Sequence, residues 1–155
     1  MKKVDIVAVM KDGAEEIQKG FKNPDDDWFP VLMIQSKGLT IPCMLKFDDD
    51  KEQICEGIAN LLKKVHADEA VLVASSWYVE RGPDHPFGLD LPVREQPDRK
   101  EVLILSHVTR DSVNVMMADI YRQESSPPTL GPWKEAGSGL GISGLFADAM
   151  RLGIG

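Results

Sequence analysis

The stretch from Asp50 to Glu80, DKEQICEGIANLLKKVHADEAVLVASSWYVE, decides the fold because it holds a helix followed directly by a strand. Asp50, with Gln53 three residues later, is a capping-box pattern for the start of a helix. One apolar stripe follows at helical spacing: Ile54, Ile58, Leu61, Leu62 and Val65. From Glu69 onward, β-branched and aromatic residues fill both faces of an extended segment. The sequence therefore predicts a helix over 50–65 and a strand over 69–80.

Two further strands are expected downstream, and a hairpin upstream. Residues 100–109 and 113–122 are apolar runs joined by the short Thr-Arg-Asp-Ser connection, so they should pair antiparallel. Residues 29–35 and 39–47 flank a Ser-Lys-Gly turn and predict a hairpin. Pro30 and Pro42 cannot donate to a ladder and belong at strand ends, bulges or an edge. We expect this hairpin to be peripheral.

The two ends of the chain are less clear. Ile6, Met10, Ile17 and Phe21 recur at helical spacing, although residues 4–10 also alternate like a strand. A helix through about Phe21 is favoured, ended by the Asn-Pro-Asp-Asp-Asp run over 23–27. At the other end, the glycine-rich stretch 137–144 precedes a short amphipathic segment over 145–152.

Together these elements predict an α+β fold in the order α-β-β-α-β-β-β-α. An antiparallel sheet of about five strands would carry helices on its faces, an order compatible with the profilin-like and roadblock-like arrangement. We expect a single α+β domain over residues 1–135 and a glycine-rich C-terminal tail with a short helix over 136–155. Between residues 80 and 100 lies a proline-containing loop that is long for a compact domain.

Composition excludes several classes of function. The formal charge of -7 and the pI near 4.9 disfavour binding to nucleic acid, which depends on neutralising phosphates with Lys and Arg. No stretch approaches the roughly 20 apolar residues that span a bilayer, and Asp5 interrupts the apolar run after Met1-Lys2-Lys3. We expect no membrane contact and a cytoplasmic location. Cys43 and Cys55 are expected to be reduced core thiols.

The motifs do not indicate a cofactor or a metal. Gly139-x-Gly141-x-x-Gly144 matches the dinucleotide fingerprint, but no strand precedes it, so a flexible tail or hinge is favoured. The acidic triplets at 25–27 and 48–50 lack the spaced ligands of a calcium loop and suit turns and caps. His66, His85 and His107 form no metal-binding motif.

The region around the long loop is the candidate binding surface. Aromatic and arginine side chains near a loop are typical of recognition surfaces. The candidate residues are Trp77, Tyr78, Glu80, His85, Arg94, Asp98 and Arg99. The alternative is structural, with Trp77 in the core and Asp98 pairing with Arg99 to set the next strand.

Two functions follow as expectations. The first is a non-catalytic binding or assembly protein that is a homo-oligomer or has a protein partner. Its contact would be a sheet edge or the C-terminal segment, through the candidate interface residues Leu145, Phe146, Met150 and Leu152. The alternative is a small hydrolase or ligand-binding enzyme that uses the 75–99 region, with a pocket in which His85, Asp98 or Glu80 approach one another within hydrogen-bond reach. A triad of Ser75 or Ser76, His85 and Asp98 can be drawn but is disfavoured, because a chain of this size always allows such a combination.

Three short motifs carry a resemblance. They are Glu69-Ala-Val-Leu-Val-Ala-Ser-Ser-Trp77, Pro97-Asp-Arg-Lys-Glu101-Val-Leu and Leu130-Gly-Pro-Trp133. The region 69–133 resembles a loose group of small hypothetical proteins from prokaryotes and their mobile elements. That group carries no assigned activity, so the resemblance implies an α+β fold and an accessory role, and no catalytic residues.

Overall fold

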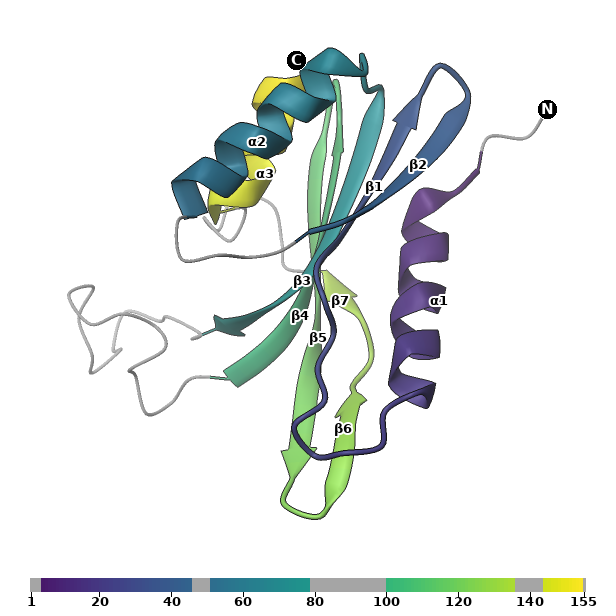
Figure 1. The fold of residues 1–155 in the computed structure, drawn as a ribbon, viewed down its shortest axis with the longest axis vertical. Coiled ribbons are helices and arrows are strands. Elements are labelled where there is room, and N and C mark those ends of the chain that lie inside the picture. Colours follow the sequence, from purple (N-terminus) through teal and green to yellow (C-terminus); the bar gives the residue numbers. More distant parts are fainter. Residues whose placement is uncertain (1–3, 46–50, 79–99, 136–143, 155) are drawn as a thin grey trace.

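A computed structural model describes residues 4–45, 51–78, 100–135 and 144–154, which form three helices and seven strands (Figure 1). In chain order the elements are α1 (Ile6–Lys19), β1 (Val31–Ser36), β2 (Leu39–Met44), α2 (Lys51–Lys64), β3 (Glu69–Tyr78), β4 (Lys100–Thr109), β5 (Val113–Gln123), β6 (Ser126–Leu130), β7 (Lys134–Glu135) and α3 (Gly144–Ile154). The predicted α+β class is confirmed, and the order of helices and strands matches the predicted one except for two additional strands, β6 and β7, before α3.

All strand pairs are antiparallel, and the sheet has the order β2-β1-β3-β4-β5-β6. The pairing of β3 with β4 runs unbroken from Glu69 opposite Thr109 to Tyr78 opposite Lys100. The predicted hairpin is confirmed as β1–β2. Its two-residue turn uses Lys37 and Gly38 at positive φ of 52° and 80°, the left-handed conformation that suits a tight hairpin.

The sheet has more strands than the five or so expected, because β6 and β7 were not predicted. Both lie along the same side of β5: β6 opposite Ile120–Gln123, and β7 opposite Met116 and Met117. No strand is expected from the sequence after residue 122, and the Ser-Ser-Pro-Pro run over 125–128 argues locally against one. Two adjacent prolines are tolerated in β6 because it forms a sheet edge and because the β5–β6 register shifts opposite them, between Tyr121 and Gln123.

Helix α1 covers one face of the sheet (Figure 1). The side chain of Asp5 caps its first turn by accepting from Ala8 N at 3.1 Å, which resolves the ambiguity of this segment in favour of a helix. Ile6, Met10 and Ala14 form its buried stripe and pack on side chains of β3, β4 and β5. The side chain of Gln18 accepts from Leu130 N at 3.1 Å and so ties α1 to β6.

Helices α2 and α3 pack together on the opposite face (Figure 1). Leu62 and Met150 are fully buried between the helices and the sheet, and Ile154 completes the contact. Gly153 permits this close approach, because a Cβ there would lie 2.7 Å from Leu62 Cβ and 2.8 Å from the carbonyl oxygen of Ala59. The segment after residue 143 is therefore packed on the domain core.

A Schellman motif ends α2. His66 has a positive φ of 53°, and its N–H donates to Lys63 O at 3.2 Å while Ala67 N donates to Leu62 O at 3.0 Å. A histidine occupies the position where glycine is usually found. The hydroxyl of Ser36 also donates to Val65 O, which fastens the β1–β2 hairpin to this helix end. The link joins one edge of the sheet to the α2 layer.

Candidate functional site

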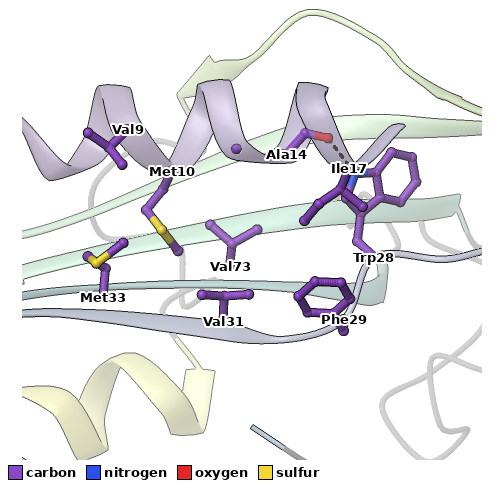
Figure 2. A pocket seen from close by; sticks show the side chains of 10 residues that line it. Val9, Met10, Ala14, Ile17, Trp28, Phe29, Val31, Met33 and Val73 are labelled. Atoms are coloured by element: carbon purple, nitrogen blue, oxygen red, sulfur yellow. Dashed lines mark hydrogen bonds between the residues drawn. The ribbon is translucent and has the colours of Figure 1, made fainter. Parts of the chain in front are cut away.

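The most distinctive surface feature is an apolar groove between α1 and β1, which we call the α1–β1 groove (Figure 2). Its volume is about 180 Å³. The described residues that line it are Val9, Met10, Gly13, Ala14, Ile17, Trp28, Phe29, Val31, Met33 and Val73. They come from α1, from the segment that connects α1 to β1, and from the sheet face beneath. The groove exists because α1 packs mainly over β3 and β6 and leaves the same face of β1 less covered.

Trp28 forms one end wall of the groove. Its side chain is 3% exposed, and its indole Nε1 donates to the carbonyl oxygen of Ala14 at 2.8 Å (Figure 2). The ring also meets Phe21 edge to face, with centroids 4.8 Å apart. These contacts hold the α1–β1 connection against the helix. The wall is therefore fixed by a buried hydrogen bond as well as by packing.

Apolar side chains are exposed around the groove. Val9 and Phe29, which line it, are each 42% exposed. Met44 is 72% exposed and stands opposite Val31 in the β1–β2 register, so it extends the apolar surface across β2. We call Val9, Phe29 and Met44 the groove rim. Single exposed apolar residues are ordinary, but several around one hollow are typical of contact surfaces.

An ionic cluster anchors the segment that carries Trp28 and Phe29. Arg122 on β5 makes a two-pronged contact with Glu101 on β4, at 2.5 and 3.1 Å, and lies 3.2 Å from Asp27 Oδ1. Its guanidinium also donates to the carbonyl oxygens of Pro24 and Asp26 at 3.1 and 3.0 Å. Glu101 raises the pKa of Arg122, which stays charged. One arginine thus holds the connecting segment to the sheet.

Two aspartates in this segment have pKa values shifted in opposite directions. Burial raises the pKa of Asp27, against the opposing effects of the Trp28 N–H and Arg122. Backbone N–H groups of Lys22 and Asn23 donate to Asp26 and lower its pKa. The acidic triplet over 25–27 therefore acts as turn and anchor. In the described residues, no three His, Cys, Asp or Glu side chains are grouped as metal ligands would be.

A second polar contact lies on the same sheet face as α1. His107 Nε2 on β4 lies 2.5 Å from Glu69 Oε2 on β3, and both side chains are largely buried. Gln35 stands opposite Glu69 on β1 and donates to Thr40 at 2.8 Å. The sequence could not pair Glu69 with His107, because their contact depends on the β3–β4 register. The pair joins the two central strands.

The predicted binding surface falls mostly outside the described residues. Glu80, His85, Arg94, Asp98 and Arg99 all lie there, as do the acidic triplet at 48–50 and the glycine motif up to Gly141. Trp77 and Tyr78 end β3, opposite Glu101 and Lys100. Ser75, one member of the triad that the sequence allows, donates to Asp27 Oδ2 at 3.4 Å. The hydrolase alternative therefore stays a prediction.

The four candidate interface residues are on α3, but they do not share one environment. Met150 is fully buried in its own chain, so it serves the core instead of a contact surface. Phe146 is partly buried against that core, whereas Leu152 is 69% exposed. Leu145 is the second residue of α3, and its side chain lies outside the described part. Only Leu152 is open to a partner among the three that are described.

Two further sequence expectations concern the cysteines and membrane-spanning helices. Cys43 and Cys55 are free thiols, with Cys55 buried and Cys43 partly so, as expected. Across the described ranges, no helix combines the length and the apolar character that crossing a bilayer requires.

Comparison with known proteins gives no relative. No protein-family model, no curated protein and no solved structure matches this chain. The resemblance over 69–133 and the likeness to the profilin and roadblock arrangement therefore stay predictions.

Proposed function

We propose that this chain is a non-catalytic binding or assembly protein, and that its partner is a second copy of itself. The observation that carries the proposal is the α1–β1 groove with its exposed rim of Val9, Phe29 and Met44. Burying apolar surface is the dominant favourable term in protein association. A face with this composition gains free energy when a second surface covers it.

A second copy suits this face because the face carries both a hollow and projecting side chains. In a two-fold dimer each surface patch meets its own copy, so it must be complementary to itself. The groove supplies the hollow, and Phe29 and Met44 supply exposed apolar groups next to it. The same patch can thus serve both sides of a symmetric contact.

The edges of the sheet are poorer sites for self-association. Leu45 N donates to Pro30 O, and the alternation of an antiparallel ladder then turns the nitrogen of Pro42 to the outer side of β2. Pro42 therefore removes a donor from the middle of that free edge. At the other edge, β6 contains Pro127 and Pro128. Proline at an edge opposes strand-to-strand pairing, which favours a contact through the face.

The net charge of -7 opposes association of two copies at long range. Salt screens this repulsion, with a Debye length of about 10 Å at 0.1 M, while it leaves the burial of apolar surface intact. We therefore expect self-association to strengthen as salt is added.

The test is the oligomeric state of two matched variants in sedimentation equilibrium. Met44→Asp and Leu152→Asp each replace an exposed apolar side chain by the same charge, one on the groove rim and one on α3. We expect the wild type and Leu152→Asp to dimerise and Met44→Asp to remain monomeric. A monomeric wild type at all concentrations would refute the proposal. Loss of the dimer only in Leu152→Asp would move the contact to α3.

A further inference from the structure

We infer that the α1–β1 groove is also a binding site for a small, uncharged, apolar molecule of about one aromatic ring. The inference goes beyond assembly, because it concerns the hollow itself and holds for a single copy of the chain. It rests on the volume of the groove, on the chemistry of its lining and on the backbone that shapes it.

The volume sets the size of the ligand. The groove measures about 180 Å³. An enclosed apolar cavity of about 150 Å³ accepts benzene or xenon, so this groove, which is open on one side, has room for one ring or a short branched alkyl group. Water gains little there, because it needs several polar partners to be well bound.

The lining sets the polarity of the ligand. The described lining residues carry one side-chain nitrogen or oxygen, the Nε1 of Trp28, and this group already donates to Ala14 O at 2.8 Å. A polar ligand would therefore lose its hydrogen bonds to water without replacement, and a charged one would lose far more. The groove selects against both.

The shape of the groove depends on one residue without a side chain. Gly13 lies in the middle of α1 and faces the groove, and a Cβ built there would meet no atom within 4 Å. Glycine inside a helix is unfavourable, so its presence on this wall keeps space open at some cost to the helix. Met10 and Met33 face each other across the groove (Figure 2), and their flexible side chains can adapt to a ligand.

Toluene is the probe, and methionine methyl groups report where it binds. Toluene is titrated into the wild-type chain, at protein concentrations at which the chain is monomeric, while the ¹³C-labelled methionine methyl resonances are recorded. We expect saturable shifts at Met10 and Met33 and none at Met150, which is buried in the core on the other face of the sheet. Shifts that never saturate, or that are largest at Met150, would overturn the inference.

Two glycine variants supply the matched control. Gly13→Leu fills the groove, whereas Gly57→Leu makes the same change in α2, where a Cβ also meets nothing within 4 Å. We expect Gly13→Leu to bind toluene at least about tenfold more weakly, because the leucine takes the space of several ligand carbon atoms. Gly57→Leu should bind as the wild type does. Equal binding by the two variants would refute the site.

The monomeric variant separates this inference from the proposed function. Met44 does not line the groove, so Met44→Asp should still bind toluene. Toluene binding without any dimer in the wild type would remove the proposed assembly and leave the ligand site standing. If the wild type dimerises but toluene does not shift the Met10 and Met33 resonances of Met44→Asp, the ligand site is refuted and the proposed assembly stands.

Discussion

The contact between α2 and α3 makes a sharp prediction for Gly153→Ala. A Cβ at this position would lie 2.7 Å from Leu62 Cβ, 2.8 Å from Ala59 O and 3.1 Å from Ala59 Cα. Two of these three atoms belong to the backbone of α2, so turning a side chain cannot relieve the overlap. The two helices must move apart, and the packing around Leu62 loosens with them.

The size of the effect follows from two opposing terms. Overpacking a core costs about 1–3 kcal/mol, and a clash with backbone belongs in the upper part of that range. Replacing glycine by alanine inside a helix stabilises the folded state by about 1 kcal/mol. The free energy of unfolding should therefore fall by about 1–2 kcal/mol. For a domain of this size the melting temperature should drop by roughly 2–8 °C.

The assay is urea and thermal unfolding followed by circular dichroism, with Gly57→Ala as the control. Gly57 is also helical, but nothing lies within 4 Å of a Cβ built on it. The same substitution should thus stabilise the protein by up to about 1 kcal/mol at residue 57 and destabilise it at residue 153. If Gly153→Ala raises stability as Gly57→Ala does, the described packing of α3 on α2 is wrong.

Three other predictions test separate contacts, each by chemical unfolding. His66→Gly should raise stability by about 1 kcal/mol, because glycine adopts the positive φ of the α2 cap without strain; an unchanged or lower stability would contradict the motif. Leu62→Ala should cost about 2–5 kcal/mol and Leu61→Ala clearly less, since Leu62 alone is fully buried; equal losses would place the helix face wrongly. Burial raises the pKa of Asp27 in the folded state above its ordinary value of 3.8, so the folded chain holds this proton to higher pH than the unfolded chain does. The free energy of unfolding should therefore decline as the pH rises from the ordinary pKa of the aspartate through its raised pKa in the folded state. Asp27→Asn should flatten this part of the pH profile, and an unchanged profile would show that Asp27 is not its source.

Local signals in the sequence were enough to predict most of the elements. The strand over 100–109 has the expected bounds, and the helix expected over 50–65 is found at 51–64. Both are encoded by short-range patterns, apolar repeats for the strand and a cap followed by a stripe for the helix. By contrast β6 was missed, because Pro127 and Pro128 argue locally against a strand. Their tolerance depends on an edge position and on a register shift against β5, both of which only the folded sheet defines.

The candidate site was harder to predict than the fold. The α1–β1 groove joins α1, residues 28–33 and Val73 of β3, and these parts come together only in the folded chain. The one local hint was Gly13-Ala14, a pair of small residues on a helix whose other turns carry larger apolar groups. The role of Trp28 depends on its hydrogen bond to Ala14, which requires the helix and the connection to be folded together.

The position of α1 also has a consequence for the time course of folding. The buried stripe of α1 rests on β3, β4 and β5, and Gln18 bonds to Leu130, yet α1 leaves the ribosome before all of them. Synthesis proceeds at about 5–20 residues per second, so the roughly 110 residues between Lys19 and Leu130 take on the order of 6–22 s. Until β5 and β6 are synthesised, Ile6 and Met10 lack part of the sheet that covers them, and the apolar side of α1 stays partly open to other chains. Misassembly of the nascent protein should therefore begin at its first helix.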